Sequence, residues 1–162
     1  MLFQSSLIDT PLGPMVAVAD ENVLHLLEFA DRLRKGLAAV PGETSPLLSI
    51  AQELRHYFAG QLQEFTTPVS PLGTPFQKRV WEELQKIPYG ETRSYAMIAA
   101  AIGRPTAFRA VAQANGANQL AIVIPCHRVI NTSGALGGYN GGIARKQWLL
   151  QRECKAALHG RF

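Results

Sequence analysis

Cysteine is scarce in this sequence: only Cys126 and Cys154 occur among 162 residues. Two cysteines are too few for a disulfide scaffold, and their separation excludes the Cys-x-x-Cys pair that is typical of metal sites. None of the four histidines stands at zinc-ligand spacing from another histidine or from a cysteine, apart from His127, which directly follows Cys126. The sequence therefore predicts no metal site.

Long hydrophobic runs are also missing. No uninterrupted apolar run approaches the about 20 residues that cross a bilayer. The first residues, MLFQSSLIDTPLGP, contain no basic region and their apolar residues are interrupted, so we expect no signal peptide. With 47% hydrophobic and 17% charged residues, the chain is typical of globular proteins. We expect a cytoplasmic protein with no membrane partner, built as one sizeable core or as two small lobes.

Positive charge is scarce in the first part of the chain, and negative charge is scarce in the second. Residues 1–73 hold four Lys or Arg against eight Asp or Glu, a net charge of −4. Residues 74–162 hold twelve Lys or Arg against four Asp or Glu, a net charge of +8. This division favours two lobes, of which the second meets a polyanion. A solvated basic surface without a polyanionic partner would give the same counts.

The first lobe is predicted to contain a small sheet. Short apolar stretches at 2–8, 15–19 and 23–29 are separated by the turn signals TPLGP and DEN, which favours a three-strand meander. A short helix is expected over 31–40.

A longer helix and a connector are expected to complete this lobe. The helix starts at Ser45 as its cap, with proline at the first helical position, and ends at Gly60. The stretch TTPVSPLGTP at 66–75 is rich in proline and is typical of a connector. We therefore expect a first domain at 1–70 and a second at 74–162.

The second lobe is predicted to be mostly helical. Residues 74–77 read TPFQ, a capping box with proline at the first helical position. Further helices are expected at about 94–102 and 107–115, separated by the break GRPT, and at 143–154. A helix, a short turn with glycine and a second helix form the pattern of a helix-turn-helix. After the capping box, apolar residues recur at helical spacing and are expected in the core: Phe76, Val80, Trp81, Leu84 and Ile87.

The stretch LAIVIPCHRVI holds the residues with the most reactive side chains. Its first part, 120–124, is predicted to be a buried strand that ends at Pro125, because proline lacks a backbone N–H and forces its predecessor into an extended conformation. Cys126 then lies at the exit of the strand. A thiol attacks only as thiolate, and at a pKa of about 8.5 it is mostly protonated at neutral pH. Cys126 therefore needs a neighbouring base, for which His127 is the candidate.

A catalytic histidine works best when a third group, usually a carboxylate, orients its ring. Glu153, near the end of the final helix, is the best candidate to orient His127, and Arg128 could add positive charge near the thiol. Free cysteine is equally often a small buried hydrophobe beside which a histidine stands by coincidence, so the residues alone leave both interpretations open. The basic lobe holds only four carboxylates: Glu82, Glu83, Glu91 and Glu153.

A family resemblance decides between these interpretations. The segment PCHRV at 125–129 resembles the active-site signature of the O6-alkylguanine-DNA alkyltransferases. Blocks similar to this family stand in order through the basic lobe: TPFQ..VW, IPYGETRSY, RAVAQANGAN, IPCHRVI, GGYNGG and RKQWLLQRE. The acidic lobe resembles the family only in TPLGP and YFAG. The resemblance implies an α/β fold: an N-terminal ribonuclease-H-like lobe with a small antiparallel sheet and helices, and a mostly helical, winged-helix-like C-terminal lobe with the helix-turn-helix.

The resemblance implies direct-reversal DNA repair without a cofactor. In this family an alkyl group moves from O6 of guanine to the cysteine, here Cys126, which is not regenerated. His127 would relay the thiol proton through a water, and Glu153 would orient His127. Asn118 matches a hinge asparagine that ties the recognition helix to the active-site loop. Tyr95 matches a tyrosine that hydrogen-bonds N3 of the extruded guanine.

The remaining site residues also follow from the resemblance. Lys146 matches a lysine that supports the tyrosine, and Arg109 matches an arginine that fills the gap left by the flipped base. Phe108 and Asn140 stand where the family has smaller residues. The expected substrate-binding residues are Val129, Tyr139, Asn140 and Gly141. The expected DNA-binding residues on the recognition helix are Ala107, Phe108, Arg109, Ala110 and Ala112, where small side chains suit the minor groove.

The implied partner is double-stranded DNA that carries O6-alkylguanine, with O4-alkylthymine as a further candidate lesion. We expect a monomer, with cooperative binding along DNA left open, and a place at the nucleoid in a bacterium. A non-catalytic damage-binding relative is the main alternative, but that class lacks the cysteine. A cysteine hydrolase usually draws its histidine from distant sequence. A transcription factor usually dimerises on paired half-sites.

Overall fold

The computed structural model describes residues 2–34 and 37–159, and its contacts divide the chain into two compact units, 1–72 and 73–162. In the described ranges, no helix combines the length and the hydropathy needed to cross a membrane.

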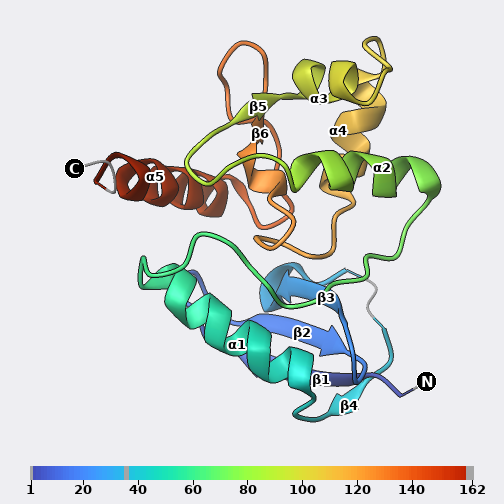
Figure 1. The fold of residues 1–162 in the computed structure, drawn as a ribbon, viewed down its shortest axis with the longest axis vertical. Coiled ribbons are helices and arrows are strands. Elements are labelled where there is room, and N and C mark those ends of the chain that lie inside the picture. The colour runs from blue at the N-terminus through green and yellow to red at the C-terminus, as the bar shows by residue number, and fades with distance from the viewer. Residues whose placement is uncertain (1, 35–36, 160–162) are drawn as a thin grey trace. The chain divides into compact units, whose positions relative to one another are not determined.

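The first unit contains a four-stranded sheet with the order β3-β2-β1-β4. β1 (Gln4–Ile8), β2 (Met15–Ala19) and β3 (Leu24–Phe29) form the expected antiparallel meander, and the short β4 (Val40–Pro41) pairs with β1 in parallel. Figure 1 shows α1 (Ser45–Phe58) lying along one face of this sheet. The predicted cap Ser45 is the first helical residue instead, because its predecessor already has the extended conformation of the cap position.

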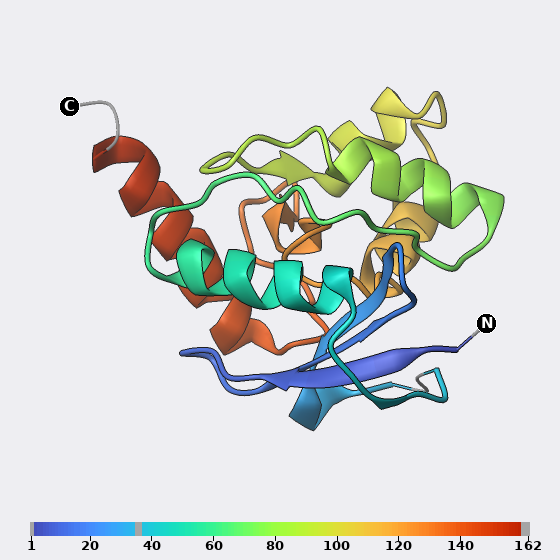
Figure 2. The ribbon, with the colours of Figure 1, turned by 60° about the horizontal axis from the view of Figure 1, so that its bottom comes forward.

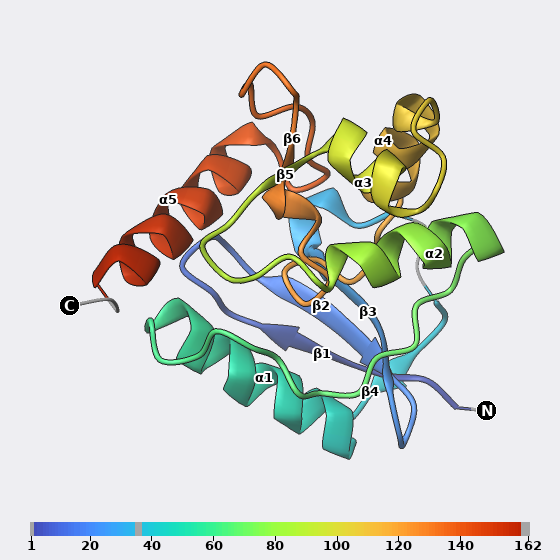
Figure 3. The same cartoon turned by 45° about the horizontal axis from the view of Figure 1, so that its top comes forward.

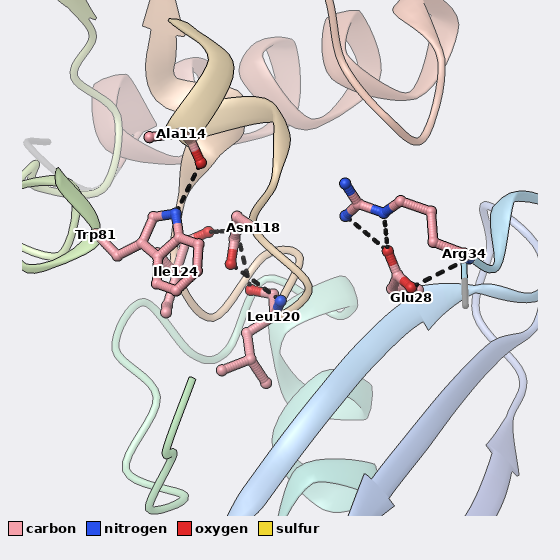
Figure 4. A network of polar contacts seen from close by, with 7 residues as sticks. All are labelled: Glu28, Arg34, Trp81, Ala114, Asn118, Leu120 and Ile124. Atoms are coloured by element: carbon pink, nitrogen blue, oxygen red, sulfur yellow. Dashed lines mark hydrogen bonds and ion pairs between the residues drawn. The ribbon is translucent and has the colours of Figure 1, made fainter. Parts of the chain in front are cut away.

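The predicted helix over 31–40 is wrong in the part of it that the structure describes. Only a single 3-10 turn, η1 (Ala30–Arg32), forms, and Leu33 is already extended. The buried Glu28 carboxylate explains this result, because it accepts hydrogen bonds from the Arg34 main-chain N at 3.3 Å and from Arg34 Nε at 2.7 Å (Figure 4). Helical i to i−4 bonding cannot compete here with a charge-assisted bond to a buried carboxylate.

The second unit is mostly helical. It contains α2 (Pro75–Leu84), β5 (Arg93–Ser94), α3 (Tyr95–Ala101), α4 (Phe108–Gly116), η2 (Cys126–Arg128), β6 (Val129–Ile130) and α5 (Ile143–His159). Figures 1 and 2 show α2, α3 and α4 gathered at one end of this unit and α5 at the other. The capping box is confirmed, since Gln77 N donates to Thr74 Oγ1 at 3.1 Å and Thr74 N donates to Gln77 Oε1 at 3.0 Å. The buried Trp81 ties α2 to α4 through a 2.8 Å bond from Nε1 to the Ala114 carbonyl (Figure 4).

The predicted strand over 120–124 is also wrong. The segment forms a tight turn, in which Ile124 N donates to the Leu120 carbonyl at 2.9 Å. The side chains of Leu120, Ile122 and Ile124 are buried. Ile122 has φ of 72°, a conformation that is strained for a β-branched residue. An apolar run needs burial but not a sheet partner, provided that its backbone groups are satisfied in another way. Here the side chain of Asn118 satisfies them, as described below.

Candidate active site

Cys126 begins the short helix η2, directly after the 120–124 turn. Its N–H donates to the Ile124 carbonyl at 2.7 Å, and the Arg128 N–H donates to the Pro125 carbonyl at 3.0 Å. The chain then enters β6, which pairs in parallel with β5, and Figure 3 shows these two strands between α5 and the α3–α4 pair. Cys126 is 6% exposed, so its thiol is largely removed from water.

His127 and Glu153 meet in the interior of the unit. His127 Nε2 lies 2.8 Å from Glu153 Oε2, although the two residues are 26 positions apart. Both side chains are at most 1% exposed. The structure therefore brings together the histidine that follows Cys126 and the carboxylate chosen from the sequence.

The electrostatic environment favours a neutral His127. Burial lowers the pKa of the imidazole, and Glu153 only partly offsets this effect. Burial alone would raise the pKa of Glu153, but His127 and Arg128 outweigh it and hold that pKa at about 2. An ionised carboxylate only accepts hydrogen bonds, so Nε2 carries the ring proton and Nδ1 is an acceptor. Nδ1 is buried and has no hydrogen-bond partner among the described residues, which leaves it free to take a proton.

Arg128, considered above as a source of positive charge at the thiol, binds Glu153. Its Nε donates to Oε1 at 2.8 Å and its Nη2 donates to Oε2 at 3.1 Å, while Nη1 donates to the Ile87 carbonyl at 2.8 Å. The guanidinium also lies over the Tyr89 ring at 5.7 Å. This bidentate ion pair fixes the carboxylate that in turn holds His127.

Two asparagines at the end of α4 hold the segment that leads to the cysteine. Asn118 Nδ2 donates to the Ile124 carbonyl at 2.9 Å, and Asn118 Oδ1 accepts from Leu120 N at 2.9 Å (Figure 4). Asn115 Nδ2 donates to the Cys126 carbonyl at 3.2 Å. Sequence reasoning missed Asn115, although a polar residue on the buried face of an amphipathic helix was a usable signal.

A negative charge on the Cys126 sulfur would raise the pKa of two tyrosines, Tyr95 and Tyr139. Burial, and then Cys126, raise the pKa of Tyr95, and the same causes raise the pKa of Tyr139 well above its usual value. Both phenols therefore stay protonated at neutral pH and can donate hydrogen bonds. The Tyr139 hydroxyl is buried without a partner in the described part of the chain, so a donor is available there for a ligand.

The loop before α5 is held by Lys146, which is fully buried. Its Nζ donates to the Val129 carbonyl at 2.7 Å and to the Gly138 carbonyl at 3.2 Å. The resemblance implies that Lys146 supports Tyr95, and this role stays a prediction; the ammonium itself bonds to these two carbonyls. Burial lowers the pKa of Lys146 to about 8. Next in this loop, Gly142 N donates to the Tyr139 carbonyl at 2.9 Å, which folds Asn140 and Gly141 into a turn.

The expected DNA-binding residues lie at the start of α4. Phe108, Arg109 and Ala110 are exposed, and Ala107 and Ala112 are partly exposed, whereas Val111 and Ala114 face the core. Phe108 does not turn inward: it is 48% exposed and borders a hollow of about 310 Å³ that Tyr95 also lines. One face of α4 is therefore open to a partner, and its opposite face holds Cys126 through Asn115.

Comparisons with known proteins follow the same division of the chain. Residues 75–155 match the family described as 6-O-methylguanine DNA methyltransferase, DNA binding domain. Residues 4–71 match the family described as 6-O-methylguanine DNA methyltransferase, ribonuclease-like domain. The chain belongs to the 6-O-methylguanine DNA methyltransferase family.

Individual members of this family are similar to this chain over most of its length. The methylated-DNA–protein-cysteine methyltransferase of Mycobacterium tuberculosis is 47% identical over 150 residues, which cover 90% of this chain and 89% of that protein. The constitutive enzyme of Bacillus subtilis is 46% identical over 138 residues, covering 82% and 84%. The crystal structure of Mycobacterium tuberculosis OGT in complex with DNA matches with a TM-score of 0.87 and 44% identity, over 96% of this chain and 94% of that one.

Membership of the 6-O-methylguanine DNA methyltransferase family gives the activity. The chain is a methylated-DNA–protein-cysteine methyltransferase by class, and it repairs DNA by direct reversal of the damage. The α/β fold, with a ribonuclease-like first domain and a helical DNA-binding domain, is the fold of this family. No relative described here favours the non-catalytic alternative.

Proposed function

We propose that Cys126 accepts the alkyl group of O6-alkylguanine in double-stranded DNA, once per protein molecule. The Cys126 sulfur attacks the alkyl carbon, so a carbon–sulfur bond forms and the bond between that carbon and O6 breaks. The thiol proton passes through a water to Nδ1 of His127, and the guanine leaves with the electron pair as an anion. The guanine then takes a proton from water, and His127 returns the thiol proton to water, so the step balances. The buried His127–Glu153 pair, with Nδ1 left as an acceptor, is the observation that carries this proposal.

Hydrogen-bond donors stabilise the departing guanine. Negative charge grows on its N3 and O6 as the alkyl group leaves, so donors at these atoms favour the transition state. In our proposal the Tyr95 hydroxyl donates to N3, the backbone around Asn140 and Gly141 donates to O6, and the Val129 carbonyl accepts from the guanine amino group. Tyr139 lines the pocket with its free hydroxyl. The raised pKa values of both tyrosines support these roles.

The lesion reaches Cys126 by flipping out of the duplex. Its reactive carbon is inaccessible in the base stack, so the nucleotide has to rotate into the pocket. The exposed face of α4 enters the minor groove, where Arg109 fills the gap in the stack and Phe108 presses on the groove wall. The net charge of +8 in residues 74–162 supports this, since phosphate contacts need no sequence readout. We propose that one protein molecule suffices for each lesion.

The test is an intact-mass and peptide-mapping experiment. The protein is mixed with duplex DNA that holds one O6-methylguanine, and Cys126→Ala is treated in parallel. Cys154→Ala is a matched control, because Cys154 is exposed and has no place in the proposed reaction. We expect the mass of one methylene on the Cys126 peptide in the native protein and in Cys154→Ala, and none in Cys126→Ala. A methylated Cys154 peptide, or binding without any mass gain, would refute Cys126 as the acceptor.

Asn115→Leu is expected to slow alkyl transfer without weakening the fold. The substitution removes one hydrogen bond to the Cys126 carbonyl and also one buried acceptor, Asn115 Oδ1, which has no partner among the described residues. We therefore expect the free energy of unfolding to change by less than about 1 kcal/mol. Loss of the anchor misplaces the thiol, so the single-turnover rate constant should fall about tenfold. An unchanged rate constant would mean that Asn115 has only a packing role.

Gly137→Ala is expected to disturb Tyr95. Gly137 has φ of +73°, which alanine adopts only with strain, and an added Cβ would lie 3.1 Å from the Tyr95 hydroxyl. We expect a loss of stability of about 1 kcal/mol and a transfer rate constant lowered about tenfold by the displaced phenol. Gly134→Ala is the matched control, because Gly134 has a similar φ of +90° but no atom within 4 Å of the added Cβ. If both variants react equally slowly, backbone strain and not the contact with Tyr95 is responsible.

A further inference from the structure

The sheet of the first unit has an edge that is only partly paired. β4 covers two residues of β1, and the Ser5 carbonyl accepts from Gly42 N at 3.1 Å just beyond it. Residues two apart in a strand face the same edge, so the N–H and C=O of Leu7 point to this side as well. Among the described residues, no main-chain group bonds to Leu7 there. Unpaired backbone groups on an edge strand invite pairing with another chain.

This open edge borders an apolar groove between β1 and α1. The groove has a volume of about 580 Å³. Two leucines on its rim are largely exposed, Leu7 at 66% and Leu48 at 57%. Figure 3 shows α1 running along β1, so the groove has a strand edge on one side and a helix on the other. The buried side chains that line it are apolar: Ile8, Leu47, Leu54 and Phe58.

The charges around the groove are unevenly placed. Asp9 follows the end of β1 and Glu43 follows β4, so a carboxylate stands near each end of the open edge. Arg55 lies on the helix side. All three side chains are exposed, and none forms an ion pair within the described ranges. The strand side of the groove is therefore acidic, as is the unit as a whole.

We propose that this groove binds an extended, basic peptide segment of a partner protein by adding it as a strand to β1. The backbone of the segment pairs with Leu7, which gives affinity without sequence readout. Its alternate side chains are apolar and enter the groove, because successive side chains of a strand point to opposite faces. A basic residue at each end faces Glu43 and Asp9. The groove lies within residues 6–59 and shares no residue with the alkyl-transfer site.

A second copy of the chain fits this edge less well. Antiparallel pairing of two β1 edges about a two-fold axis would place Glu43 of one copy near Asp9 of the other. Like charges across paired strands are destabilising. The charges therefore favour a basic partner over self-association.

The test uses the full chain and a defined peptide. The peptide Lys-Ile-Thr-Ile-Thr-Ile-Lys, blocked at both termini, is titrated into the ¹⁵N-labelled protein, and a second peptide with Glu at both ends serves as the charge control. We expect saturable amide shifts at Leu7 and along α1, with the Glu peptide binding at least about tenfold more weakly. Leu48→Asp should weaken binding of the Lys peptide by a similar factor. Leu33→Asp, an exposed leucine outside the groove, should leave binding unchanged.

Alkyl transfer by each variant is measured beside the titration and reports on folding. Leu48→Asp should transfer at the native rate, so that a loss of peptide binding is separable from any failure of the reaction itself. Absence of shifts at Leu7, equal binding of both peptides, or unchanged binding by Leu48→Asp would overturn the proposal. Concentration-dependent shifts at the groove without peptide would identify a second copy as the occupant and would overturn it too.

Discussion

Glu153→Gln is expected to lower the free energy of unfolding by about 3–5 kcal/mol, because it leaves the buried Arg128 guanidinium without its counter-ion. The carboxylate is 1% exposed and accepts two bonds from Arg128 and one from His127. An amide can replace only part of this, since one of its two polar groups is a donor. We also expect the transfer rate constant to fall by about 10²- to 10⁴-fold, because His127 loses the ionised acceptor that fixes its proton on Nε2 and stabilises the protonated ring.

The same carboxylate predicts how stability depends on pH. The pKa of Glu153 is about 2 in the folded protein, against 4.5 for a free glutamate. A group whose pKa is lowered by folding stabilises the protein above its unfolded pKa, and this contribution is lost as the pH falls towards the folded value. Between pH 4.5 and about 2, the native protein should therefore lose more stability than Glu153→Gln does.

Urea unfolding at pH 7 and at acid pH, together with single-turnover kinetics, measures these effects. Glu82→Gln is the matched control, because Glu82 is exposed on α2 and has no part in the pair. Its free energy of unfolding should stay within about 0.5 kcal/mol of the native value. A Glu153→Gln protein as stable and as fast as the native one would contradict the arrangement of His127, Glu153 and Arg128 described above.

Asn118→Leu is expected to cost about 3 kcal/mol of stability, since it leaves the buried Leu120 N–H without its acceptor and removes one of the two hydrogen bonds to the Ile124 carbonyl, which keeps the bond from Cys126 N. These bonds hold the turn in which Ile122 adopts its strained φ of 72°. Without them the turn relaxes and Cys126 moves, so we expect the transfer rate constant to fall by about 100-fold.

Asn118→Asp separates the contribution of the bond to the Ile124 carbonyl from that of the bond to the Leu120 N–H. Aspartate keeps the acceptor for Leu120 N but loses the donor to the Ile124 carbonyl, so its stability should lie between those of the native protein and Asn118→Leu. Gln147→Leu, an exposed substitution of the same kind on α5, should leave both stability and rate near native values. Thermal melting and transfer kinetics measure the series. Equal stability of all four proteins would show that the turn does not depend on Asn118.

Much of the second unit follows from local sequence. The capping box at 74–77 and the helical spacing after it predict α2, because both signals act within one or two turns of the chain. The adjacent Cys126 and His127 predict a reactive site, and Glu153 is the one of the four carboxylates in the basic lobe that we chose as the partner of His127. Strong local preferences of this kind do not depend on distant contacts.

Two of the wrong predictions involve a polar side chain that binds the backbone of another segment. The Glu28 carboxylate accepts hydrogen bonds from the main chain and the side chain of Arg34, within the segment that was predicted to be a helix. Asn118 satisfies the backbone of the apolar run 120–124, so that run is buried as a turn and not as a strand. Hydrophobic periodicity carries no information about such side-chain-to-backbone bonds.

The sequence by itself determined the fold class, the charge division and the helices of the second unit, and it predicted Cys126 as the reactive cysteine with His127 and Glu153 as its partners. Only the tertiary structure decided how His127, Glu153 and Arg128 share their hydrogen bonds, that Asn115 binds the Cys126 carbonyl, and that β1 keeps an open edge beside a groove. The reason is physical: capping and periodicity act between near neighbours in the chain. Hydrogen bonds such as that between His127 and Glu153, 26 residues apart, exist only after the chain has packed.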